Sequence, residues 1–319
     1  MRNRENDEAS WWLQLNDEYV PVKNRQRKNF QRKKIKPVEA RAELAEQLYQ
    51  EEAEYNFTYH ASRHEQQWIS LALRTFYEDS LISDVLSMVK AGKEANVYCC
   101  RAHPNIGLGL LAAKIYRPSL LRNLKNDAIY KEGRPLFSDE GKAIRGGREH
   151  RAVAKKTRKG KEITITSWIE HEYLTMQVLH KAGADVPRPV AQSGNAILME
   201  FIGEEGSPAP VLSDVRLPYD EARPMFKRLV EDVGIFLAHD RIHADLSAYN
   251  ILYWEGKGTL IDFPQVVDPI FNPNGARMLL RDVTRLCQYF YGYGIKADPQ
   301  KLTNDLWGAY LRGDFRTAY

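Results

Sequence analysis

The sequence is poor in cysteine and has no long apolar run, and each absence excludes a class of protein. Only three of its 319 residues are cysteine. Cys99, Cys100 and Cys287 show neither metal-ligand spacing nor the even count of a disulfide framework. No apolar run reaches the ~18 residues that a membrane-spanning helix requires, and the first eight residues lack the apolar core of a signal peptide. We therefore expect a cytoplasmic protein without a membrane partner.

A glycine-rich phosphate-binding motif is also missing. The chain contains no Gly-x4-Gly-Lys-Ser/Thr pattern, which excludes the P-loop NTPases. The formal net charge is only +4, but positive residues crowd segments 23–36 and 142–161. Such clusters can neutralise phosphates, so both segments predict contact with RNA. A solvated arm and loop are the alternative interpretation.

The strongest chemical signal lies between residues 243 and 262. This stretch reads His-Ala-Asp-Leu-Ser-Ala-Tyr-Asn-Ile-Leu-Tyr-Trp-Glu-Gly-Lys-Gly-Thr-Leu-Ile-Asp. A short loop carries Asp245 and Asn250, and an apolar hairpin returns Asp262 beside Asn250. Phosphoryl transfer needs one carboxylate to orient or deprotonate the acceptor, and a second Asp with an Asn to hold Mg²⁺. The stretch therefore predicts phosphoryl transfer, with surface carboxylates between two core strands as the alternative.

A lysine inside an apolar strand adds to the same prediction. Lys114 lies in the run Leu-Leu-Ala-Ala-Lys-Ile-Tyr, where a charge is costly unless an anion meets it. We expect it to contact phosphate, although an edge-strand lysine that reaches solvent would fit the same pattern. Ser167 predicts the N-cap of a helix on which Glu172 is the natural partner of Lys114. Glu170 is the competing partner if this helix is rotated.

Apolar periodicity predicts an α+β fold, with strands first and helices later in two unequal lobes around a cleft. The expected parts are a basic, partly disordered N-terminal extension (1–62), an N-lobe (63–200) and a C-lobe (201–319). Strands are expected at residues 85–89, 96–100, 108–116, 186–192 and 196–201, and helices near 68–76, 119–132, 221–237, 276–290 and 303–311. Residues 137–161 predict a mobile basic insertion in the N-lobe.

These motifs resemble the RIO-type atypical serine/threonine protein kinases, over residues 68 to 288. Residues 92–98 (Gly-Lys-Glu-Ala-Asn-Val-Tyr) resemble the phosphate loop of that family, and 199–203 (Met-Glu-Phe-Ile-Gly) resemble its hinge. Residues 243–250 resemble its catalytic loop, and Ile261-Asp262 its metal-binding loop. The pieces most resemble the branch without an N-terminal winged helix, although Asp-Phe-Pro-Gln at 262–265 is closer to the sister branch.

The resemblance implies a two-lobed protein-kinase-like fold, with a β-rich N-lobe and an α-helical C-lobe. It implies ATP as substrate and Mg²⁺ as cofactor, with Mn²⁺ as a substitute. Asp245 would be the catalytic base, and Asn250 and Asp262 would hold the metal ion. The remaining implied contacts are with the nucleotide: Gly92, Lys93 and Lys114 with the phosphates, and the backbone of Glu200 and Ile202 with the adenine.

The resemblance also implies two kinds of phosphoryl acceptor. One is a serine or threonine, on another protein or on the chain itself. The other is Asp262, because RIO proteins are described as ATPase switches in small ribosomal subunit maturation whose metal-binding aspartate accepts phosphate.

Two further functions stay open at this stage. The Asp-x4-Asn motif with a later Asp also occurs in small-molecule kinases of the aminoglycoside or choline type. The basic segments would equally suit a non-enzymatic factor that binds RNA or the ribosome. Ordinary protein kinases are a poorer match, because only Gly92 remains of the three loop glycines and Ala244 replaces the arginine of their His-Arg-Asp motif.

Overall fold

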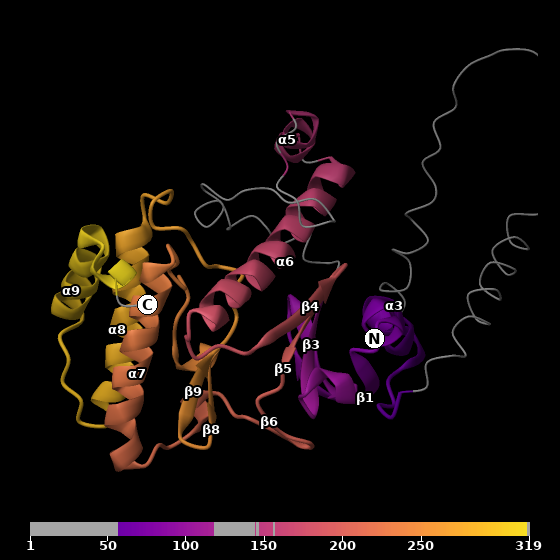
Figure 1. The fold of residues 1–319 in the computed structure, drawn as a ribbon, viewed down its shortest axis with the longest axis horizontal. Helices are drawn as coiled ribbons and strands as arrows, with labels where there is room; N and C mark the ends of the chain where they lie inside the picture. The colour runs from indigo at the N-terminus through magenta and orange to yellow at the C-terminus, as the bar shows by residue number, and fades with distance from the viewer. Residues whose placement is uncertain (1–56, 118–143, 145–146, 156, 318–319) are drawn as a thin grey trace, which may run out of the picture. The chain divides into compact units, whose positions relative to one another are not determined.

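A five-stranded antiparallel sheet and several helices make up the part of the chain that the structure describes (Figure 1). This computed structural model describes residues 57–117, 144, 147–155 and 157–317, all within the unit formed by residues 52–319. The expected helix at 119–132 and the basic segment 23–36 lie outside the described residues. No helix among those described is long and apolar enough to cross a membrane.

The sheet places Lys114 near its centre. Its strands lie in the order β1-β2-β3-β5-β4, and β3 pairs with β2 on one side and with β5 on the other. Lys114 on β3 is opposite Val97 of β2 and Ile197 of β5. The strands are β1 (Ile82–Ala91), β2 (Ala95–Ala102), β3 (Leu110–Tyr116), β4 (Pro189–Ser193) and β5 (Ala196–Glu200).

Helix α3 (Arg63–Glu78) packs on this sheet because three residues on one of its faces are apolar. Ile69, Leu73 and Phe76 are fully buried and join the cluster that contains Tyr98 and Leu111 of the sheet. Their spacing of four and three residues is that of one helical face. These contacts form the smaller of two hydrophobic cores.

The second core lies among the C-terminal helices and a hairpin. Helix α7 supplies Leu229 and Phe236, and α8 supplies Leu279, Leu286 and Phe290. The helices are α7 (Tyr219–Ala238), α8 (Gly275–Tyr291) and α9 (Pro299–Arg312), and the hairpin strands are β8 (Ile251–Trp254) and β9 (Lys257–Leu260). The short elements are β6 (Gly203–Glu204), β7 (Ser207–Pro208), η2 (Pro104–Ile106), η5 (Leu212–Asp214), η6 (Ala248–Asn250) and η7 (Asp314–Thr317).

The prediction of a loop at 137–161 is wrong where the structure describes it, and the mobility of this segment stays a prediction. Residues Gly147–Ala154 form helix α5, and Arg158–Lys181 form helix α6. The N-cap of α6 is Thr157, whose hydroxyl accepts from the N–H of Gly160, so the expected N-cap Ser167 lies inside the helix. Positive charge suggested a loop, but lysine and arginine are good helix formers.

Helices α5 and α6 meet at a tight corner. The N–H of Thr157 donates to the carbonyl of Ala152 at 3.1 Å, and its hydroxyl reaches the same oxygen at 3.2 Å. A Cβ on Gly160 would lie 2.1 Å from that oxygen. Only glycine lets the backbone of α5 approach this closely, and Figure 1 shows α5 at the N-terminal end of α6.

Replacing Gly160 with alanine should separate α5 from α6. The added methyl group meets backbone atoms that cannot rotate away, so we expect a loss of about 1–3 kcal/mol in the free energy of unfolding. Chemical denaturation measures this loss, and hydrogen exchange across residues 147–155 should accelerate. Gly308→Ala on α9 is the control, because its Cβ would meet only the flexible end of Arg312 at 3.1 Å. Unchanged exchange in Gly160→Ala would contradict the prediction.

Candidate active site

The turn between β1 and β2 is closed by a backbone contact at its only glycine. The N–H of Gly92 donates to the carbonyl of Ala95 at 3.0 Å, and a Cβ on Gly92 would lie 2.6 Å from that oxygen. Lys93 is exposed at the tip of the turn. The predicted phosphate loop is thus a tight turn in which a glycine permits the close approach of the backbone.

Lys114 contacts two carboxylates that come from distant parts of the chain. Its Nζ lies 2.8 Å from Oε1 of Glu172 on α6 and 2.7 Å from Oδ1 of Asp262, which follows β9. The Lys114 and Glu172 side chains are 13% and 2% exposed, whereas that of Asp262 is 46% exposed. One buried pair and one solvent-facing carboxylate therefore share a single cation.

This arrangement keeps Lys114 charged. Burial alone would lower its pKa, but the negative charges of Asp262 and Glu172 outweigh burial and raise the pKa above its usual value. Lys114 in turn holds the pKa of Asp262 below its usual range, while burial raises that of Glu172. Asp262 is thus ionised at neutral pH and suited to a cation.

The structure brings Glu172 rather than Glu170 to Lys114. Glu170 is buried on the same helix, and burial raises the pKa of its carboxyl group. Because α6 begins at Arg158, Glu170 lies inside the helix and not in its first turn.

The catalytic loop orients Asn250 through Asp245. The Nδ2 of Asn250 donates to the backbone carbonyl of Asp245 at 2.9 Å and lies 3.4 Å from its Oδ2. Because the nitrogen faces Asp245, the amide oxygen of Asn250 is left for a cation. The other carboxylate oxygen of Asp245, Oδ1, accepts from Nη1 of Arg285 on α8 at 2.9 Å.

Asp262 has a left-handed backbone with φ +73°. A non-glycine residue costs about 1–2 kcal/mol in this conformation, so its neighbours must hold it. The N–H of Ile261 donates to the carbonyl of Asn250 at 3.0 Å. Burial lowers the pKa of His243, and the neutral ring donates from Nε2 to the carbonyl of Ile261 at 3.1 Å. The catalytic loop therefore fixes the residue that precedes Asp262.

Helix α6 holds the segment that follows Asp262. The indole Nε1 of Trp168 donates to the carbonyl of Pro264 at 2.8 Å, and Nε2 of His171 lies 3.3 Å from the carbonyl of Val266. The helix that carries Glu172 thus contacts Lys114 and is also bonded to the segment that follows Asp262.

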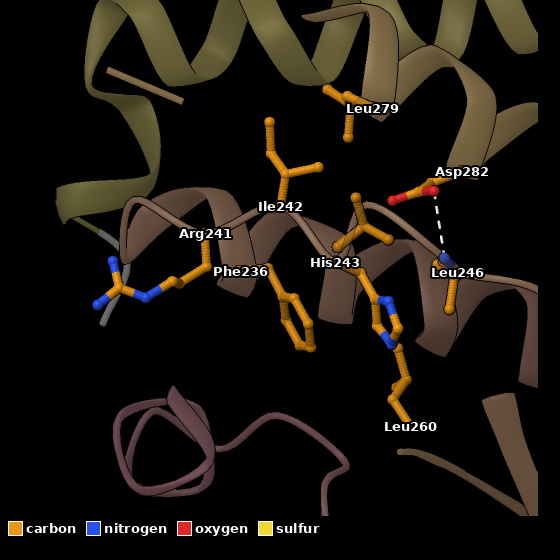
Figure 2. A pocket seen from close by; sticks show the side chains of 9 residues that line it. Phe236, Arg241, Ile242, His243, Leu246, Leu260, Leu279 and Asp282 are labelled. Carbon is orange, nitrogen blue, oxygen red and sulfur yellow. Dashed lines mark hydrogen bonds between the residues drawn. The ribbon is translucent and has the colours of Figure 1, made fainter. Parts of the chain in front are cut away.

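A buried aspartate on α8 holds the backbone of the catalytic loop. Asp282 accepts from the N–H of Ala244 at 2.7 Å and from that of Leu246 at 3.1 Å, although burial raises its pKa to about 7. Ala244 has φ +62°. Figure 2 shows Asp282, joined by a hydrogen bond to Leu246, near His243. These three residues help to line a small cavity of about 10 Å³, most of whose other lining side chains are apolar.

Sequence reasoning missed Asp282 and Arg285, which both act on Asp245 or its neighbours. A signal for Asp282 was present, since it falls on the apolar stripe of α8 with Leu279, Val283 and Leu286. Arg285 carries no comparable signal, because charged residues on helices usually face solvent.

The predicted hinge presents one backbone donor. The N–H of Ile202 has no hydrogen-bond partner among the described residues, while its carbonyl accepts from Ala209 at 3.0 Å. The N–H of Glu200 is bonded to the carbonyl of Arg188 at 2.8 Å. Gly203 follows with φ +123°, and a Cβ there would lie 2.6 Å from the Ser207 carbonyl. Ile202 is therefore free to donate to an adenine edge, and Glu200 has only its carbonyl to offer.

The oxygen donors at this site suit Mg²⁺. The described residues contain no group of three or more His, Cys, Asp or Glu side chains that could enclose a metal ion. Asn250 and Asp262 supply one amide oxygen and one carboxylate. Mg²⁺ typically takes one or two carboxylates and completes its shell with water and substrate phosphate oxygens, so two protein oxygen ligands fit it.

Comparison with known proteins identifies the family. The model of the RIO domain matches residues 124–302, more than half of the chain. The chain therefore belongs to the family of RIO-type atypical serine/threonine kinases. The match begins after β3, so it does not include Lys114.

Two curated relatives show the extent of the similarity. The serine/threonine-protein kinase RIO1 of Caenorhabditis elegans is 29% identical over 226 residues, which are 70% of this chain but only 40% of that protein. The RIO-type serine/threonine-protein kinase Rio1 of Thermoplasma acidophilum is 30% identical over 196 residues, 61% of this chain and 92% of that protein. The assignment to the branch without a winged helix stays a prediction.

A solved structure confirms the predicted fold class. The crystal structure of the Rio2 kinase-ADP/Mg²⁺-phosphoaspartate complex from Chaetomium thermophilum matches with a TM-score of 0.51 and 22% identity, covering 74% of this chain and 64% of that chain. The two-lobed α+β kinase-like fold is therefore shown. The division between residues 200 and 201 stays a prediction.

Removing the Asp282 carboxylate should loosen the catalytic loop. Asp282→Ala leaves the N–H groups of Ala244 and Leu246 buried without acceptors, and each such loss costs about 1–3 kcal/mol. Chemical denaturation should show the lower stability, and hydrogen exchange of the two amides should accelerate. Asp305→Ala on α9, at an exposed position, is the control. Equal stability of the two variants would argue against this role.

Proposed function

We propose that the chain is an ATP- and Mg²⁺-dependent phosphoryl transferase that acts as a serine/threonine kinase or as an ATPase. The observation that carries the proposal is the contact of Lys114 with both Glu172 and Asp262. A strand lysine held by a helix glutamate next to a metal-binding aspartate is the arrangement that positions ATP phosphates in kinases.

Each residue of the site has a defined task in this proposal. Asn250 and Asp262 would hold Mg²⁺, which when bound supplies positive charge to the phosphate oxygens. Lys114 donates to a phosphate oxygen while Glu172 keeps it in place. Asp245 orients the attacking hydroxyl group or water molecule and accepts its proton.

We also propose that Asp262 itself can accept the phosphoryl group. Its carboxylate oxygen would form a bond to the γ-phosphorus as the bond to the β-phosphate oxygen breaks and ADP leaves. Attack of water on phosphorus would then release phosphate and restore the carboxylate. The similar Rio2 structure, described as a phosphoaspartate complex, supports this step.

A single-turnover experiment with γ-labelled ATP and Mg²⁺ tests the reaction and identifies the acceptor. We expect the parent chain, quenched in acid, to carry label that hydroxylamine releases and that Asp262→Asn lacks. Asp245→Asn should bind nucleotide as the parent does but turn over about 10²–10⁴-fold more slowly, because it lacks the proton acceptor.

The other outcomes separate the alternatives. Label that resists hydroxylamine and lies on serine or threonine would make the chain a protein kinase without an aspartyl phosphate. If the parent neither becomes labelled nor hydrolyses ATP, the proposed function is wrong.

We further propose that the corner of α5 and α6 contacts structured RNA, such as the ribosomal RNA of a pre-ribosomal particle. Arg148, Arg151 and Lys155 are exposed and follow the three- and four-residue spacing of one helical face. The described residues include no acidic partner for them. Like charges at this spacing destabilise a helix, and a polyanion would remove that cost.

Charge reversal at this corner tests the RNA proposal. The triple variant Arg148→Glu, Arg151→Glu and Lys155→Glu should bind structured RNA at least about tenfold more weakly. The slope of the logarithm of the binding constant against the logarithm of salt concentration should fall in magnitude by about one for each lost phosphate contact. Lys257→Glu, Lys296→Glu and Lys301→Glu together are the matched control, since these lysines are exposed elsewhere. Equal binding by both variants would exclude the corner as an RNA contact.

We keep the proposal of a cytoplasmic location. Cys99, Cys100 and Cys287 are all buried free thiols, and burial raises the pKa of each. Unpaired thiols of this kind are typical of a reducing compartment.

A further inference from the structure

Helix α8 places a positive charge directly against the catalytic-loop carboxylate. Arg285 Nη1 lies 2.9 Å from Asp245 Oδ1, and the two side chains are 39% and 38% exposed. One turn earlier on the same helix, Arg281 donates from Nη2 to the carbonyl of Ala244. Asp282 accepts from the N–H of the same residue. The helix therefore holds the backbone of the loop and its reactive side chain together.

Stability alone does not explain the contact between Arg285 and Asp245. Both side chains are more than a third exposed, and an ion pair of this kind adds little to the free energy of folding. The neighbouring contacts of Asp282 already fix the backbone on either side of Asp245. What Arg285 adds is a restraint on the side-chain torsions of Asp245, which the backbone contacts leave open.

The restraint distinguishes the two oxygens of the carboxylate. Oδ1 is taken by Arg285, while Oδ2 is approached among the described residues only by Asn250 Nδ2, at the long distance of 3.4 Å. That amide already has a better acceptor in the Asp245 carbonyl at 2.9 Å. Oδ2 is therefore the oxygen that remains available to accept a proton from an incoming group.

We propose that Arg285 is a positioning residue that holds Asp245 with Oδ2 toward the phosphoryl acceptor. This inference rests on the proposed phosphoryl transfer. Arg285 would act through Asp245 and not on the nucleotide. Its described contact from α8 is with the catalytic loop, and not with Lys114 or Asp262. Its loss should therefore slow the chemical step and leave ATP binding unchanged.

Steady-state ATP turnover with Mg²⁺, measured on the full chain, tests the inference with Arg285→Ala and Arg285→Lys. We expect Arg285→Ala to lower kcat by about 10–100-fold, since misplacing a reacting group by about 1 Å has effects of this size. The KM for ATP and the affinity for a fluorescent ADP analogue should change less than about twofold. Arg285→Lys should recover part of the loss, because it keeps the charge but not the fixed planar geometry.

A matched control and a double variant make the test specific. Arg277→Ala changes an exposed arginine two turns earlier on α8 and should turn over ATP as the parent does. In an Asp245→Asn background, Arg285→Ala should have no further effect on kcat, because both changes remove the same orientation.

Three results would overturn the inference while the proposed function stands. The first is parental kcat and KM in Arg285→Ala, and the second is a raised KM with unchanged kcat in the same variant. The third is a kcat of the double variant that shows the losses of both single variants added together. If Arg285→Ala does not fold, Arg285→Lys replaces it in the test, and parental kcat in that variant would contradict the expected partial loss. Absence of turnover in the parent chain would instead reject the proposed function itself.

Discussion

The buried charge of Lys114 is the constraint on which the site depends. A cation at the centre of an apolar sheet is stable only if anions reach it, and here they come from α6 and from the end of the β8–β9 hairpin. The sheet, the long helix and the hairpin must therefore meet at one point.

Asp262 is the solvent-facing member of this group. A ligand that approaches the site meets a carboxylate and a lysine that already neutralise each other, so it must offer both a cation and an anion to replace that contact. A nucleotide bound to a divalent metal ion offers both.

The catalytic loop depends on a second buried polar group, the carboxyl group of Asp282. Its two backbone contacts keep Ala244 in a left-handed conformation, and Asp262 has a left-handed backbone on the facing segment. Both strained residues are next to the proposed chemistry, where the surrounding contacts can hold them. Asn250 links the two segments, because its side chain is bonded to Asp245 and its carbonyl to Ile261.

Sequence reasoning succeeded where a residue was unusual for its surroundings. Lys114 in an apolar strand and the ordered Asp245, Asn250 and Asp262 pointed to one site, and the structure brings these residues together. It failed where a polar residue looked ordinary. Arg285 resembles any surface charge of a helix, because residue type does not tell which partner a side chain meets. The basic residues of α5 resemble a loop, because residue type does not show the close backbone contact at Gly160. The start of α6 was also missed, because Ser167, a plausible N-cap residue, lies inside the same helix.

The attachment of α6 determines how this site can be controlled. In ordinary protein kinases the glutamate that pairs with the strand lysine lies on a helix whose position is regulated. Here Trp168 and His171 bond α6 to the segment after Asp262, and Ile169 and Met176 belong to the same core as α7 and α8. Swinging α6 outward would break those bonds and expose that core. An inactive state made by displacing this helix is therefore costly, and α6 is a fixed part of the site and not a movable switch.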